Sequence, residues 1–108
     1  MAYNENLEAR IKVVVADWPN WSRKKMFGGI CHLLNGNMFS GVYKDYLILR
    51  LGPTAAEAAL RKHHVRPFDI TGRPMSGWVM VEEPGFKGEK LDHWLKEART
   101  FAQGLPPK

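Results

Sequence analysis

Apolar residues recur at helical spacing near both ends of the chain, and each run has a start or stop signal. Asn4 precedes the first run and Pro19 follows it, so the pattern predicts an N-terminal helix capped by Asn4. Gly104 follows the second run and predicts the end of a C-terminal helix. The first run is Leu7, Ile11, Val14, Val15 and Trp18, and the second is Leu91, Trp94, Leu95, Ala98, Phe101 and Ala102.

Between these helices, residues 23–51 have the pattern of short strands joined by tight turns. A strand is predicted from Arg23 to Phe27, followed by the pair Gly28-Gly29. Asn35-Gly36 is a strong hairpin signal, because both residues tolerate the positive φ of a type I′ turn. Lys44-Asp45 is a second, weaker turn signal. The stretch therefore predicts an antiparallel β-meander.

Counting outward from two-residue turns predicts which residues face each other. His32 is expected opposite Phe39, and Phe39 opposite Arg50. The predicted core face carries Cys31, Leu33, Met38, Val42, Leu47, Leu49 and Leu51. The other face carries Ile30, His32, Phe39, Tyr43, Tyr46, Ile48 and Arg50. Because this second face is also apolar, we expect a helix of this chain or a partner to cover it.

Two further elements complete the predicted fold. Thr54 and Glu57 have capping-box spacing, so a middle helix is expected to start at Thr54 and to run to about His63. Residues 77–82 form a strand that is apolar on both faces and therefore buried. We predict an α+β fold, an antiparallel meander sheet flanked by N-terminal, middle and C-terminal helices. One domain is expected over residues 1–108, with its core at about 5–103.

Composition limits the class of protein. The chain has 44% hydrophobic and 25% charged residues, as soluble globular domains do, and it lacks an apolar run of about 20 residues. The N-terminus lacks the pattern of a secretory signal, and Cys31 is the single cysteine, so a reducing cytoplasm is expected. The net charge of +5 permits binding to nucleic acid or acidic partners without requiring it.

The sequence contains no pattern that predicts catalysis. His32, His63, His64, His93 and Cys31 lack the spacing of a zinc site. Cys31 lies on the predicted core face, where a thiol is inert. The carboxylates are scattered, and the glycines do not form a phosphate-binding loop. We therefore expect a protein that is not an enzyme and that has no metal or cofactor.

Candidate binding residues fall into three groups. Arg23, Lys24 and Lys25 form the only tight cationic run, and Arg66 and Arg73 belong to a second, looser group. The ladder of His32, Phe39 and Arg50 is typical of a sheet face on which single-stranded nucleic acid stacks, provided that it is exposed. Lysines that protect a sheet edge from aggregation explain Lys24 and Lys25 equally well.

Five segments of the chain form a distinctive combination of motifs: residues 23–29 (RKKMFGG), 35–39 (NGNMF), 46–50 (YLILR), 66–69 (RPFD) and 72–78 (GRPMSGW). Together they resemble the N-terminal domain of the TfoX (Sxy) family, regulators of natural competence in bacteria. The resemblance implies an antiparallel sheet flanked by helices and a role in transcriptional regulation beside a DNA-bound activator. Full-length regulators carry a second, helical C-terminal domain, which this chain is expected to lack. The resemblance implies no catalytic residues.

Three functions follow as hypotheses. The first is a non-enzymatic regulatory module that binds a protein partner through Arg23–Lys25, the Arg66–Arg73 loop and the exposed part of the His32, Phe39 and Arg50 face. The second is direct nucleic-acid binding through the same cations. The third is a small ligand binder or enzyme with a pocket near residues 64–78, where His64, Arg73 and Trp78 converge. A homodimer is compatible with each of them.

Overall fold

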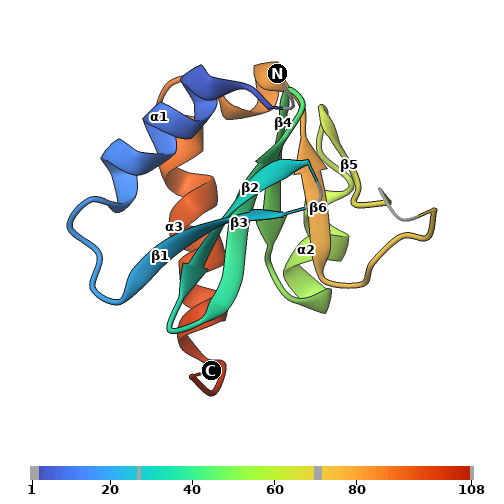
Figure 1. The fold of residues 1–108 in the computed structure, drawn as a ribbon. Coiled ribbons are helices and arrows are strands. Elements are labelled where there is room, and N and C mark those ends of the chain that lie inside the picture. Colours follow the sequence, from blue (N-terminus) through green and yellow to red (C-terminus); the bar gives the residue numbers. More distant parts are fainter. Residues whose placement is uncertain (1–2, 27, 70–71, 108) are drawn as a thin grey trace.

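The strands pair into one antiparallel sheet, as the short turns predict. The computed structural model describes residues 3–26, 28–69 and 72–107. Its sheet has six strands in the order β1-β2-β3-β4-β6-β5 (Figure 1). They are β1 (Trp21–Met26), β2 (Gly29–Leu34), β3 (Asn37–Tyr43), β4 (Tyr46–Arg50), β5 (Val65–Pro67) and β6 (Trp78–Val81). Phe27, the predicted end of the first strand, lies outside the described residues.

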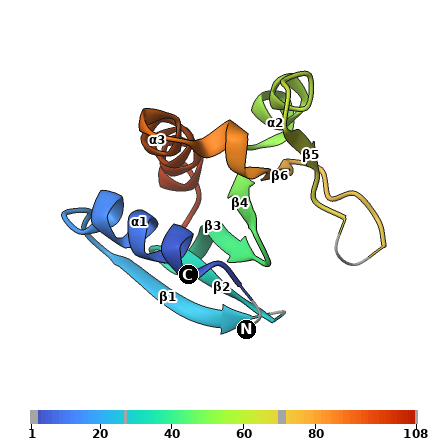
Figure 2. The same ribbon diagram turned by 90° about the horizontal axis from the view of Figure 1, so that it is seen from above.

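Three helices flank this sheet, so the predicted α+β class is confirmed. They are α1 (Glu5–Val15), α2 (Pro53–Ala59) and α3 (Glu89–Gln103), and a short 3-10 helix, η1 (Glu83–Phe86), leads into α3. Figure 2 shows α1 and α3 next to each other over the same face of the sheet. The main core lies between them and the strands, where Ile11, Leu49 and Leu95 are fully buried.

The cap of the first helix is as predicted, and that of the middle helix is not. The Asn4 side chain accepts a hydrogen bond of 3.0 Å from the Leu7 backbone N–H. The expectation that Thr54 caps α2 is wrong, because the helix begins one residue earlier at Pro53 after Gly52 and has no side-chain cap. Proline suits this first position because the backbone N–H that it lacks would have no helical partner. The helix also ends at Ala59, short of His63.

A β-bulge changes the predicted register of the meander. Leu34 pairs with Asn37 and Leu33 with Met38, as counting from the Asn35-Gly36 turn predicts, but His32 then pairs with Ser40 instead of Phe39. Phe39 is thus the extra residue of the bulge. Its side chain joins the main core together with Ile30 and Leu34, whereas Met38 packs in a second cluster on the other face. The predicted face assignment is therefore wrong for these residues.

The second face of the sheet is covered in part by the chain itself. Ile48, Phe68 and Met80 form a small buried cluster there, against which Trp78 packs. The rings of Phe68 and Trp78 stack with their centroids 5.5 Å apart. Phe68, which follows β5, therefore buries the part of this face around β4 and β6, where the sequence led us to expect a helix or a partner. On the same face Met38, Tyr43 and Tyr46 are only partly buried.

Candidate functional site

Strand β1 forms one edge of the sheet, and most of it faces water. It is the first strand in the sheet order and pairs with β2, so alternate residues direct their backbone N–H and C=O groups away from the sheet. Trp21 packs against the core, and each residue from Ser22 to Met26 is exposed. An edge of this kind can accept another strand.

The three predicted cations of β1 are not equivalent. Arg23 is 40% exposed, and its Nη2 lies 2.9 Å from Oε2 of Glu8 on α1. Lys24 and Lys25 are exposed, and neither forms an ion pair with another described residue. Two positive charges on this edge are therefore available to an acidic partner.

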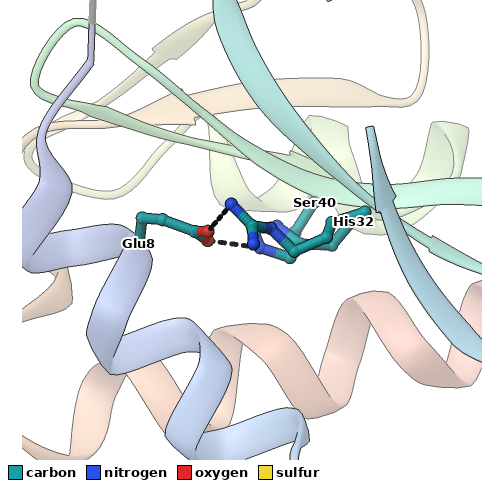
Figure 3. A network of polar contacts seen from close by, with 4 residues as sticks. Glu8, His32 and Ser40 are labelled. Atoms are coloured by element: carbon teal, nitrogen blue, oxygen red, sulfur yellow. Dashed lines mark hydrogen bonds and ion pairs between the residues drawn. The ribbon is translucent and has the colours of Figure 1, made fainter. Parts of the chain in front are cut away.

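Glu8, in turn, contacts a histidine in the interior. Oε1 of Glu8 lies 2.7 Å from Nε2 of His32, and the hydroxyl of Ser40 lies 3.4 Å from Nδ1 of the same ring (Figure 3). Because the Glu8 carboxylate can only accept, Nε2 carries the proton, and Nδ1 is then free to accept from Ser40. The network connects α1 to β2 and β3, while Arg23 extends it to the surface.

Burial controls the charge of His32. It lowers the pKa of the imidazole below its ordinary value of 6.5, and the positive charges of Arg23 and Lys12 act in the same direction. The charge of Glu8 and its hydrogen bond oppose this shift. A neutral His32 agrees with the hydrogen bonds described above.

A serine, a histidine and a carboxylate in one network have the composition of a catalytic triad, but these three are enclosed. Ser40 and His32 have no exposed surface, and Glu8 is 5% exposed. A nucleophile has to reach its substrate, and Ser40 does not. The arrangement therefore serves to hold α1 against the sheet.

The other two residues of the predicted ladder, Phe39 and Arg50, are also buried or in contact with aromatic side chains. Phe39 is fully buried, with its ring centroid 5.6 Å from that of Trp18. The Arg50 guanidinium lies 5.4 Å from the ring centroid of Trp78 and 5.5 Å from that of Phe101. None of the three residues offers an exposed ring on which a nucleic-acid base can stack.

The second cationic group lies far from the first in the sheet order. Arg66 is on β5, the last strand of that order, where it donates a hydrogen bond of 3.1 Å to the Tyr46 hydroxyl and lies 3.7 Å from Glu82. Arg73 is exposed in the loop before β6. The predicted cations thus form two separate groups.

The residues predicted to line one pocket near residues 64–78 lie in different places. His64 lines one hollow together with residues of α3, and Trp78 lines another beside α2. Arg73 lines neither of them. The three side chains that were expected to converge therefore do not share a cavity.

Comparison with models of protein families shows which family the chain belongs to. The model described as TfoX N-terminal domain matches residues 14–102. The chain belongs to the TfoX N-terminal domain family. The match includes β1, the sheet and nearly all of α3, so the resemblance seen in the sequence is confirmed. Comparisons with curated proteins and with solved structures each found no significant match.

Glu8 precedes the segment matched to the TfoX N-terminal domain, and sequence reasoning missed its role. Its place in the first turn of the predicted helix indicates only a favourable interaction with the helix dipole. Its spacing to Ile11 and Val15 nevertheless places it on the buried stripe of α1. A carboxylate on an apolar stripe signals a buried partner, because an unpaired charge in the interior is costly.

Two further observations on this TfoX N-terminal domain concern membrane-spanning helices and metal-binding side chains. None of the helices in the described ranges is long and apolar enough to cross a membrane. Within the same ranges, no three His, Cys, Asp or Glu side chains gather closely enough to hold a metal ion.

Proposed function

We propose that this TfoX N-terminal domain is a non-enzymatic regulatory module that binds a protein partner in transcriptional regulation, in the bacterial cytoplasm. Family membership supports the regulatory role. The observation that carries the proposed binding mode is the exposed edge of β1, where free backbone groups lie beside Lys24 and Lys25. Proteins commonly recognise extended segments by adding them as a strand to such an edge.

Charge favours an acidic partner segment over a second copy of this chain. If two copies paired antiparallel through β1, the cations at positions 23 to 25 would face one another across the new ladder. Like charges in cross-strand positions are unfavourable, and opposite charges are favourable. The same cations therefore discourage self-association and attract an extended acidic segment.

The absence of enzymatic activity is part of the proposal. Ser40, His32 and Glu8 form the network closest in composition to a catalytic group, and they are buried. Cys31 is buried as well, and burial raises the pKa of its thiol to about 11. A thiol of this kind is a poor nucleophile near neutral pH.

Site-specific crosslinking tests the binding mode. A photo-crosslinking side chain at Ser22 is expected to capture a partner in cells of the source organism, and the same group at Val13, an exposed residue of α1, is not. Lys24→Glu with Lys25→Glu is expected to abolish the capture. Arg61→Glu with Lys87→Glu makes the same change in net charge at other exposed positions and is expected to preserve it. Equal loss in both double variants would contradict binding through β1.

Direct nucleic-acid binding is the alternative that uses the same three adjacent cations. Fluorescence anisotropy of labelled DNA and RNA distinguishes this alternative from the binding of a protein partner. Binding that weakens steeply with salt and disappears in the Lys24→Glu/Lys25→Glu variant would favour this alternative, because released counterions set the salt dependence. We expect no specific binding near physiological salt, since the predicted stacking residues are not exposed.

A further inference from the structure

A hollow of about 360 Å³ lies between the turn after α2 and the first half of α3. This volume is within the range of small-molecule sites. The hollow is far from β1 in the sheet order, since it adjoins the segment that leads into β5. Its lining residues are Lys62, His63, His64, Gly85, Lys90, His93, Trp94 and Glu97.

The lining is rich in groups that bind anions. It contains two lysines and three histidines, and Glu97 is its one acidic side chain. An ammonium group attracts an anion as a point charge, and imidazoles add hydrogen-bond donors. The positive groups of the lining therefore outnumber the negative one, and they come from both walls of the hollow.

Trp94 forms a fixed part of the wall. Its Nε1 donates a hydrogen bond of 2.8 Å to the carbonyl oxygen of Gly85, and the ammonium group of Lys62 lies 5.0 Å from the centroid of its ring. Only 7% of Trp94 is exposed. A largely covered ring is unsuited to stacking on an aromatic ligand, so charge and hydrogen bonds are the means of recognition that remain.

His64 occupies this hollow in an unfavourable backbone conformation. Its φ is +68°, a region that residues with a Cβ atom disfavour and that glycine adopts freely. The backbone is held there because the Glu82 N–H donates to the His64 carbonyl oxygen at 2.8 Å. Gly85 makes room for this turn, since a Cβ at position 85 would lie 3.2 Å from that of His64 and 2.6 Å from Cγ1 of Val81. Nδ1 of its ring lies 3.7 Å from Oε1 of Glu82, a half-exposed contact that helps to orient the side chain. A residue kept at such a position suggests a use for its side chain.

We propose that this hollow binds a small molecule carrying a phosphate group, with Lys62 and Lys90 supplying the charge and the histidines supplying hydrogen-bond donors. A phosphate dianion matches two ammonium groups more closely than a single carboxylate does. A metal ion is the less suitable ligand, because the described residues hold no cluster of three metal-binding side chains.

Isothermal titration with inorganic phosphate and pyrophosphate, at constant ionic strength, tests the proposal. Pyrophosphate is expected to bind more tightly than phosphate, because it carries more charge in a volume that the hollow accommodates. Lys62→Ala with Lys90→Ala is expected to weaken binding at least about tenfold. The matched control, Lys12→Ala with Lys44→Ala, removes the same charge at two exposed positions that do not line the hollow and is expected to leave the affinity unchanged.

His64→Gly separates binding from folding. Glycine adopts a positive φ without strain, so this variant is expected to melt at the same or a higher temperature than the parent protein. It is also expected to bind pyrophosphate more weakly, because a hydrogen-bond donor is lost. A variant that was more stable and bound equally well would remove His64 from the site.

Three results would overturn the proposal. The first is no heat of binding with either anion, and the second is equal weakening in the two double-lysine variants, which would mean attraction to net charge alone. The third is tighter binding of a dicarboxylate such as succinate, or of a phosphorylated peptide or oligonucleotide, since either would assign the hollow to another class of ligand.

Discussion

Glu8 and His32 meet in the interior between α1 and the sheet, with Oε1 of the carboxylate 2.7 Å from Nε2 of the ring. One oxygen of the Glu8 carboxylate thus contacts a fully buried imidazole, and the other contacts Arg23 on the exposed strand β1. The same carboxylate stabilises the helix–sheet contact and orients a side chain of the proposed binding edge. Substitutions at Glu8 should therefore affect both the stability of the helix–sheet contact and the orientation of Arg23.

Removal of the Glu8 carboxylate should destabilise the protein. Glu8→Ala leaves the Nε2–H of His32 buried without an acceptor, which costs about 2–3 kcal/mol. Urea unfolding followed by circular dichroism measures the change. Glu5→Ala is the matched control, since Glu5 is exposed in the same helical turn and should change stability by about 0.5 kcal/mol or less. Similar effects of the two variants would show that the buried contact contributes little.

Stability should fall as the pH is lowered from neutral. The unfolded chain binds a proton on His32 near pH 6.5, while burial lowers the pKa of the folded state, so acid favours the unfolded chain. The stability that the neutral, buried His32 contributes is fully present above pH 6.5. It is lost as the pH falls from 6.5 to the lower pKa of the folded state. The slope in this window is at most about 1.4 kcal/mol per pH unit.

His32→Gln isolates this effect, because glutamine keeps an N–H donor for Glu8 and does not titrate. The free energy of unfolding of both proteins is measured across the window, and the difference between the two curves should shrink toward acid pH. Parallel curves would mean that the other groups in the protein, and not His32, determine its response to acid.

Turns were predictable from the sequence, and the sheet order was not. Asn35 and Gly36 have φ values of 53° and 84°, and Lys44 has a φ of 53°, so both turns occur where short-range signals place them. The position of β6 between β4 and β5 depends on contacts between distant segments. For this reason Arg23 and Arg66, which we considered as parts of one surface, lie at opposite ends of the sheet order.

The bulge explains most of the remaining errors. A residue inserted opposite His32 has no local signal in the sequence, yet it moves Phe39 into the main core and Met38 to the other face. The predicted surface ladder of His32, Phe39 and Arg50 depended on an unbroken register. Register counted from a turn is therefore reliable only as far as the first bulge.

Close packing beside this bulge makes Gly41 difficult to replace. A Cβ at this position would lie 2.7 Å from the carbonyl oxygen of Ile30, a backbone atom that cannot move aside easily. Gly41→Ala should therefore destabilise the protein by about 1–3 kcal/mol, as overpacking does. Gly104→Ala is the control, since its nearest contact would be 3.5 Å and its φ is −83°, and thermal melting compares the two. An unaffected melting temperature in Gly41→Ala would contradict the close pairing of β2 and β3.

Cys31 should react with thiol reagents only when the protein unfolds. The side chain is fully buried, and desolvation raises the pKa of the thiol to about 11 although Lys24 acts in the opposite direction. At about pH 8 the thiolate is then roughly one part in a thousand, and the reagent also has to reach it. Colorimetric titration with an aromatic disulfide should give almost no reaction in buffer and one equivalent in urea. Ser22→Cys, on exposed β1, should add one equivalent that reacts at once in buffer. Rapid reaction of the parent protein in buffer would mean that β1 separates readily from β2 and that the edge proposed for binding is not firmly paired.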